Sequence, residues 1–196
     1  FLDVHQARFV DAQGEAIGTV GCARDITERK ASEAFVLHLA HHDALTDLPN
    51  RACLEDRMRT AIARVRREDR SLCLLYLDLD HFKAINDEHG HPVGDRVLQG
   101  CAQCCLDHLR APALCARTGG EEFCILLPGV SADAAQATAE RIRTAVAAAR
   151  LCLEHPALRV TASFGVTGLG PADAHFGAVY SCADRALYTA KQQWSN

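Results

Sequence analysis

SLCLLYLDL, residues 71–79, is an almost continuous apolar run with an acidic side chain, Asp78, next to its end. A short run of this kind is typical of a strand buried on both faces at the centre of a sheet. A carboxylate at the carboxyl end of such a strand lies at the rim of the sheet, where α/β proteins place ligands. Residues 71–79 therefore predict the middle of the fold and the edge at which a functional site is expected.

Helix and strand patterns surround this run. Helices are expected at 51–67, from Pro92 to about Leu109, from a cap at Ser131 to about Ala149, and over 176–193. Further strands are expected at 113–118, 122–127 and 158–169, the first two forming a hairpin around Gly119-Gly120. The segment 81–95 is polar and is expected to be irregular. This order predicts an α+β fold, in which helices flank a central mixed β-sheet.

Residues 1–26 alternate as strands do, with a hairpin turn at DAQGEAIG, 11–18, and residues 27–42 read as a helix. Two strands alone are marginally stable, so we expect them to complete a larger sheet. The helix fits a signalling connection between two modules or a plain linker, and the helical pattern does not separate these. The chain does not open with Met, and we expect it to be a piece of a longer protein.

The composition argues against several kinds of partner and site. The net charge of −4 and pI near 6.2 do not favour nucleic acid or an anionic membrane as partner. Most of the ten cysteines lie in apolar runs, which indicates small buried side chains in a reducing compartment. Cys101, Cys104, Cys105 and His108 fall within one helix, where a metal site is the less favoured interpretation. No signal peptide or membrane span is seen, so a cytoplasmic location is expected.

Four acidic residues suggest metal chemistry. Asp78 and Asp80 follow the central strand, and Glu121 and Glu122 follow a Gly-Gly turn whose tip can approach a ligand closely. If Glu121 and Glu122 begin a strand they point to opposite faces, so that one reaches the cation of Asp78 while the other faces away. Such oxygen ligands suit Mg²⁺ in phosphoryl transfer, since Mg²⁺ shares its coordination shell with phosphates.

Polar residues between these acids suit a nucleotide. An amide at Asn86 and a carboxylate at Asp95 together could read a guanine edge. Lys83 and nearby backbone N–H groups could meet phosphates.

Four separate stretches carry a resemblance. DALTDLPNR (43–51), DLDHFKAINDEHGHPVGDRVL (78–98), RTGGEEF (117–123) and ADRALYTAK (183–191) resemble, in order and spacing, the motifs of the GGDEF family of diguanylate cyclases. Residues 1–26 resemble the last strands of a PAS sensor domain. The resemblance implies a domain at 43–196, preceded by a PAS fragment at 1–26 and a signalling helix at 27–42.

The resemblance also implies an activity: two GTP molecules condense to cyclic di-GMP and two pyrophosphates, at the interface of a bacterial homodimer. Carried over by position, Asp78, Glu121 and the Leu79 carbonyl hold Mg²⁺ (or Mn²⁺), and Glu122 supports the site. Asn86 and Asp95 read guanine. Phosphates are held by the backbone of His81, Phe82 and Lys83 and by the Lys191 side chain, and Gly119 and Gly120 form the turn.

Two positions depart from the family pattern. The family's inhibitory Arg-x-x-Asp product site reads Arg110-Ala111-Pro112-Ala113 here, so product inhibition through it is expected to be weak or absent. A phosphate-binding arginine near the end is replaced by Ser195. The alternative to an active enzyme is therefore a GTP-binding regulatory module acting on an adjacent phosphodiesterase domain. A product-binding effector is disfavoured by Ala113.

Overall fold

The computed structural model describes residues 1–68, 71–169 and 176–194. The chain divides into two units, Phe1–Ala40 and His41–Asn196.

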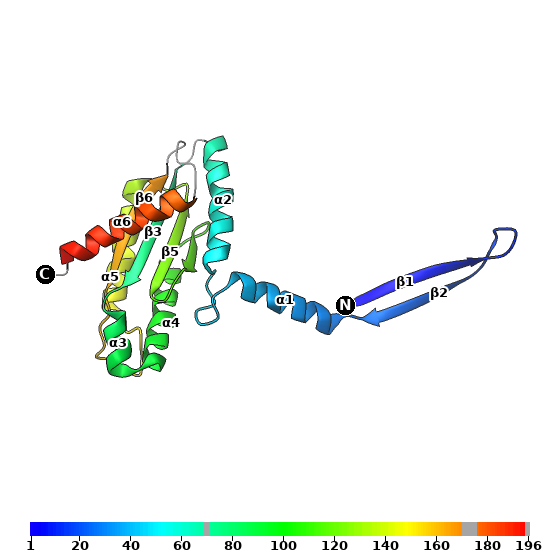
Figure 1. The fold of residues 1–196 in the computed structure, drawn as a ribbon, viewed down its shortest axis with the longest axis horizontal. Coiled ribbons are helices and arrows are strands. Elements are labelled where there is room, and N and C mark those ends of the chain that lie inside the picture. Colours follow the sequence, from blue (N-terminus) through cyan, green and yellow to red (C-terminus); the bar gives the residue numbers. More distant parts are fainter. Residues whose placement is uncertain (69–70, 170–175, 195–196) are drawn as a thin grey trace. The chain divides into compact units, whose positions relative to one another are not determined.

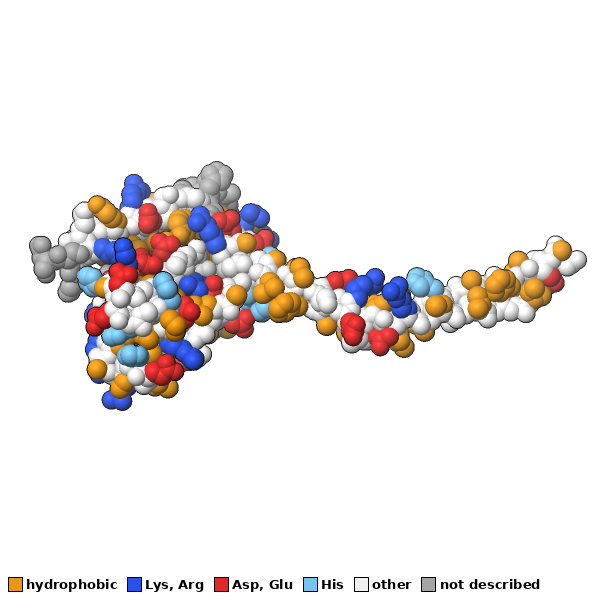
Figure 2. All heavy atoms as spheres, turned by 60° about the horizontal axis from the view of Figure 1, so that its bottom comes forward, with side chains coloured by type: hydrophobic (Ala, Val, Ile, Leu, Met, Phe, Trp, Pro, Cys, Tyr) orange, Lys and Arg blue, Asp and Glu red, His pale blue; other side chains and the backbone are white. Residues whose placement is uncertain are grey.

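The first unit is a hairpin followed by a helix. Strands β1 (Leu2–Val10) and β2 (Ala16–Asp25) pair antiparallel, and α1 spans Thr27–His41. The Asp11 carboxylate accepts the N–H groups of Gln13 and Glu15, both at 2.9 Å, which closes the turn. The hairpin expected from the sequence is confirmed, but its side chains are largely exposed, as are Phe35, Leu37 and Leu39 of α1 (Figure 2).

The second unit contains a sheet covered by helices on both faces (Figure 1). In chain order its elements are α2 (Arg51–Glu68), β3 (Leu72–Leu79), α3 (Phe82–His89), α4 (His91–Asp107), β4 (Leu114–Arg117), β5 (Glu122–Pro128), α5 (Ala132–Ala148), β6 (Ala162–Leu169) and α6 (Phe176–Trp194). The expected α+β fold with helices around a central sheet is confirmed. No helix in the described ranges is long and apolar enough to span a membrane.

The strand order is β4-β5-β3-β6. Each neighbouring pair is antiparallel, so the described sheet is antiparallel where a mixed sheet was expected. Strand β3 lies between β5 and β6, and all eight of its residues are buried. Residues 71–79 thus form the central strand that their apolar run predicted.

Alternation along β3 divides the core into two layers. Cys73, Leu75 and Leu77 pack with residues of α4 and α5 on one face of the sheet. Leu72, Leu74 and Tyr76 pack with residues of α2 and α6 on the other. A run that is apolar at every position is required because both faces of β3 are covered.

Two boundaries differ from the sequence expectation. Residues 81–95 are not irregular, because α3 buries Phe82 and Ile85, three residues apart, and ends at Gly90 with φ 84°. Only two apolar residues mark this helix, too few for a periodic signal. Strand β6 begins at Ala162 rather than 158, since Leu158 closes a turn onto the His155 carbonyl. The Ser131 cap is confirmed by its hydrogen bond from the Ala134 N–H.

Gly165 of β6 lets α6 approach the sheet closely. A Cβ at Gly165 would collide with the Ala183 carbonyl and lie 2.6 Å from the Leu187 nitrogen. Both obstacles are backbone atoms of α6, so they can yield only if the helix moves away.

Replacing Gly165 with alanine should therefore reduce the free energy of unfolding by about 1–3 kcal/mol, as overpacking does. Gly177 on α6 is the matched control, because a Cβ there meets nothing within 4 Å. Gly177→Ala should leave stability unchanged or raise it by up to about 1 kcal/mol. Urea denaturation of both variants tests this, and equal stability of G165A and the wild type would contradict the close approach.

Candidate active site

Asp78 is the buried polar residue of the described core, at 8% exposure. It is the last but one residue of β3, and its Oδ1 lies 2.6 Å from Nζ of Lys191 on α6. This oxygen is inaccessible to solvent. Apart from the Lys191 ammonium group, it has no hydrogen-bond partner within the described chain. A buried carboxylate oxygen with an incomplete set of partners is suited to a further cation.

The charges around Asp78 also favour a bound cation. Burial raises the pKa of the Asp78 carboxyl, Lys191 lowers it, and the negative charges of Glu121 and Glu122 raise it again. The net shift is upward, so one ammonium group does not compensate for the burial and for two neighbouring carboxylates. The arrangement thus brings Asp78, Glu121, Glu122 and Lys191 together.

The hairpin between β4 and β5 delivers the two glutamates. Glu121 lies just before β5, and its carbonyl accepts the Leu79 N–H at 3.3 Å, which fixes it beside the end of β3. Glu122 is the direct cross-strand partner of Asp78. Residues directly opposite one another in a sheet share a face, so the Glu122 side chain lies on the same face as Asp78.

Gly119 makes room for this arrangement. A Cβ at Gly119 would collide with Oε2 of Glu122, so the Glu122 carboxylate lies directly over the turn. Gly120 has open space around it. A side chain at position 119 would thus displace the Glu122 carboxylate from this place, whereas one at position 120 would not.

An ion pair clamps the same hairpin. Arg117 donates from Nε and Nη2 to the Gly120 carbonyl, and its Nη1 lies 2.8 Å from the Asp43 carboxylate. Asp43 also accepts from the N–H and hydroxyl of Thr46. Both ends of the clamp belong to motifs quoted above, DALTDLPNR and RTGGEEF. The two motifs are visible in the sequence, but the contact between them is visible only in the structure.

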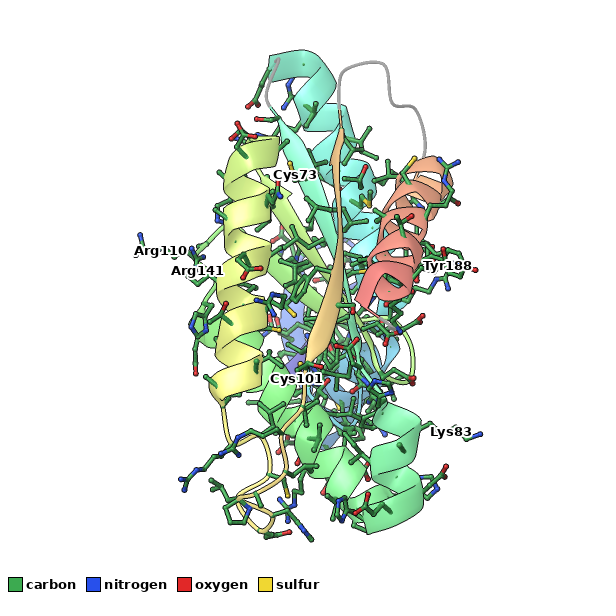
Figure 3. All side chains as sticks on the ribbon, turned by 90° about the vertical axis from the view of Figure 1, so that its left-hand side faces the viewer. Cys73, Lys83, Cys101, Arg110, Arg141 and Tyr188 are labelled. Carbon is green, nitrogen blue, oxygen red and sulfur yellow. The ribbon has the colours of Figure 1, made fainter. Side chains whose placement is uncertain are left out.

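Backbone N–H groups at the start of α3 form a second part of the site. His81 precedes the helix with φ 56°, and no side chain caps this terminus. An uncapped helix start attracts anions, which suits phosphate binding by the backbone of His81, Phe82 and Lys83. Phe82 is buried, whereas the Lys83 side chain extends away from the ribbon (Figure 3).

Asn86 and Asp95 come from adjacent helices, α3 and α4. Oδ1 of Asn86 is buried without a hydrogen-bond partner within the described chain. It lies against Gly94, where a Cβ would collide with it. Asp95 follows Gly94 and is exposed. A buried amide oxygen without a partner beside an accessible carboxylate provides polar groups for a ligand.

Other candidates are placed differently. Asp80 accepts hydroxyl hydrogen bonds from Thr161 and Ser163, both at 2.7 Å, so it ties the end of β3 to β6. Arg110 follows α4 and points outward near Arg141 (Figure 3), while Ala113 is half-buried. Ser195 lies outside the described residues.

Six of the ten cysteines are buried core side chains, whereas Cys22 and Cys182 are exposed. Cys101, Cys105 and Cys115 are buried within 0–3% exposure, and His108 directs Nδ1 to the Cys104 carbonyl. Among the described residues, no group of three or more His, Cys, Asp or Glu side chains is arranged to hold a metal by itself. A cation at Asp78 and Glu121 would therefore need backbone or phosphate oxygens as further ligands, which is how Mg²⁺ is commonly held.

The Asp43–Arg117 pair should contribute to stability in a pH-dependent way. Burial alone would raise the pKa of Asp43, but hydrogen bonds from Thr46 and Arg117 outweigh it and lower the pKa. A lowered pKa gives stability that is present above the ordinary pKa of aspartate and is lost as the pH falls through the lowered value. Asp43→Asn should therefore cost about 1–2 kcal/mol at pH 7, allowing for solvent screening, and almost nothing near pH 2.

Urea denaturation at both pH values measures this difference. The control is Arg143→Ala, which breaks an exposed ion pair with Glu140 and should cost no more than about 0.5 kcal/mol. A loss in D43N that is the same at both pH values would contradict the role given to the Asp43 charge.

Comparison with known proteins agrees with this geometry. Residues 40–196 match the model of the family described as "Diguanylate cyclase, GGDEF domain". The diguanylate cyclase DgcP of Pseudomonas aeruginosa is 38% identical over 199 residues, which cover 97% of this chain. The chain spans only 30% of the length of that relative.

Solved structures show the same fold. The coiled coil and GGDEF domain of DgcB from Caulobacter crescentus, in complex with c-di-GMP, aligns with a TM-score of 0.78 at 30% identity, covering 86% of this chain and 90% of that one. The active GGEEF domain of a diguanylate cyclase from Vibrio cholerae aligns with a TM-score of 0.70 at 34% identity, covering 74% and 92%. With its four motifs, its sheet and its acidic hairpin, the chain belongs to the diguanylate cyclase GGDEF-domain family.

Proposed function

We propose that residues 43–196 are the catalytic domain of an active diguanylate cyclase, which converts two GTP into cyclic di-GMP and two pyrophosphates. The observation that carries this proposal is the meeting of Asp78, Glu121 and Glu122 with Lys191 at the end of β3. Similarity to the domain from Vibrio cholerae called active, which shares the Gly-Gly-Glu-Glu-Phe signature, supports it.

Asp78 and Glu121, with the Leu79 carbonyl, would hold Mg²⁺ or Mn²⁺. The crowding of carboxylates around the poorly partnered Oδ1 of Asp78 fits such a cation. A bound divalent ion would supply electrostatic stabilisation of the charge that develops on the phosphates. Glu122 supports the same site from the adjacent position on β5.

The remaining residues position GTP. The amide of Asn86 and the carboxylate of Asp95 recognise the guanine edge, and the N–H groups at the start of α3 and the Lys191 ammonium hold phosphates. In the reaction, the 3′-hydroxyl of one GTP attacks the α-phosphate of the other, and pyrophosphate leaves. Since each protomer positions one GTP, catalysis requires a homodimer, and orientation of the two substrates supplies much of the acceleration.

The N-terminal unit is proposed to be a signal input. Residues 1–26 form a hairpin with exposed apolar side chains, which suits the last strands of a PAS sensor domain. Residues 27–42 would then transmit the signal to the domain at 43–196, and α1 accounts for most of that segment.

A second candidate is a GTP-binding regulatory module with little or no turnover, acting on an adjacent phosphodiesterase domain. It is favoured by Ser195, which stands where the family carries a phosphate-binding arginine. One lost charged contact to a phosphate costs about 1.5–3 kcal/mol, so a reduction of tenfold or more in binding or rate separates the two candidates.

Incubation of the dimeric chain with GTP and Mg²⁺ should yield cyclic di-GMP, detected by chromatography and mass spectrometry. Asp78→Asn and Glu121→Gln should each reduce the rate at least 100-fold, because both remove a carboxylate from the proposed cation site. Asp87→Asn, at an exposed position of α3, is the control and should keep the wild-type rate. A dimeric sample that binds GTP but forms no product would favour the regulatory module.

Product inhibition through the Arg110 region should be absent. Arg110 lacks its aspartate partner, since position 113 is alanine. Cyclic di-GMP at concentrations well above the enzyme's should leave the initial rate unchanged, and Ala113→Asp should create inhibition that Arg110→Ala removes again. Isothermal calorimetry that detects tight cyclic di-GMP binding to the wild type, abolished by Arg110→Ala, would contradict this.

A further inference from the structure

Two tyrosines meet beneath the acidic hairpin. Tyr76 on β3 is 2% exposed, and its hydroxyl oxygen lies 2.7 Å from that of Tyr180 on α6. The rings pack edge to face, with centroids 5.0 Å apart and planes at 70°. The Arg51 guanidinium lies over the Tyr180 ring, 5.1 Å from its centroid. Three elements, α2, β3 and α6, therefore converge on this pair.

The pair adjoins the catalytic face of the sheet. Tyr76 and Asp78 are two residues apart on β3 and so share a face. Their cross-strand partners on β5 are Cys124 and Glu122, which places Glu122 diagonally next to Tyr76. Diagonal neighbours in a sheet are within reach of long side chains, so the Tyr76 hydroxyl and the Glu122 carboxylate can meet. A phenol hydroxyl is a hydrogen-bond donor at neutral pH.

The direction of these hydrogen bonds follows from the groups involved. An ionised carboxylate can only accept, and a tyrosine hydroxyl donates one hydrogen. If the Glu122 carboxylate accepts the Tyr76 hydrogen, the hydrogen shared between the two hydroxyls must come from Tyr180. The chain of donors ends at the carboxylate that lies over Gly119.

We propose that Tyr76 and Tyr180 are positioning residues whose hydroxyls hold the Glu122 carboxylate over Gly119, and so fix the turn that presents Glu121 to Asp78. This inference rests on the proposed cyclase activity of the site. Tyr180 lies about three helical turns from Lys191 on α6. The same contact therefore sets the position of the helix whose ammonium group reaches Asp78.

Tyr76→Phe and Tyr180→Phe test the proposal, because each keeps the ring packing and removes one hydroxyl. In the dimeric chain with GTP and Mg²⁺, kcat should fall about tenfold in each variant, while KM for GTP should change less than about twofold. The double variant should lose no more than Y76F, since both hydroxyls act through Glu122. In a Glu122→Ala background, which removes the acceptor, Tyr76→Phe should have almost no further effect.

Tyr188→Phe is the control. Tyr188 is on the same helix, is 64% exposed, and accepts a hydrogen bond from Gln192 rather than contacting the hairpin. It should keep wild-type kcat. A wild-type kcat in Y76F, or an equal loss in the Glu122→Ala background, would overturn the positioning role.

A measurement without turnover separates this proposal from the proposed function. Hydrogen exchange of residues 117–123, followed by mass spectrometry, should be at least fivefold faster in Y76F and Y180F than in the wild type or Y188F. If the wild type makes no cyclic di-GMP but exchange responds in this way, the proposed function fails and the positioning of Glu122 stands. Unchanged exchange in Y76F overturns the positioning whatever the activity.

Discussion

The site depends on one constraint, the burial of the Asp78 carboxylate at the end of an otherwise apolar strand. A buried carboxylate is costly unless charge and hydrogen bonds compensate for it. Here the close partner is Lys191, more than a hundred residues away in sequence, and the nearest neighbours also include two further acids. The sheet, the acidic hairpin and α6 must all be in place before Asp78 has its surroundings. Assembly of the site therefore requires contributions from β3, the hairpin before β5, and α6.

Close backbone approach makes this assembly possible. Gly165 lets α6 lie against β6, Gly119 admits the Glu122 carboxylate over the turn, and Gly94 admits the Asn86 amide between α3 and α4. In each case a methyl group would occupy space that a helix or a functional side chain already fills. These glycines act through the volume they leave free rather than through an unusual φ, which none of the three shows.

Much of this could be predicted from the sequence, and the limits have physical reasons. The central strand was predictable because residues 72–79 are buried on both faces, which leaves a continuous apolar run. Helix α3 was missed because only Phe82 and Ile85 are buried in it. Strand alternation predicted opposite faces for Glu121 and Glu122 but left open which one shares the face of Asp78, because the pairing of Glu122 with Asp78 depends on register. Asp43 and Arg117 belong to two separate motifs that the sequence shows. Their ion pair is a tertiary contact, which no local sequence pattern encodes.

The contact between the two tyrosines could not be predicted from the sequence either. Tyr76 is part of the apolar run, and in sequence its ring is indistinguishable from any other large core side chain. The proposed role of its hydroxyl depends on two tertiary features. The strand register places Glu122 diagonally opposite Tyr76, and Gly165 lets α6 approach so that the two tyrosine hydroxyl oxygens lie 2.7 Å apart. A polar group in this core must be satisfied, and satisfying it ties the hairpin to the helix that carries Lys191. The face of β3 that carries Tyr76 and Asp78 thus helps to set the geometry of the carboxylates at the end of the strand.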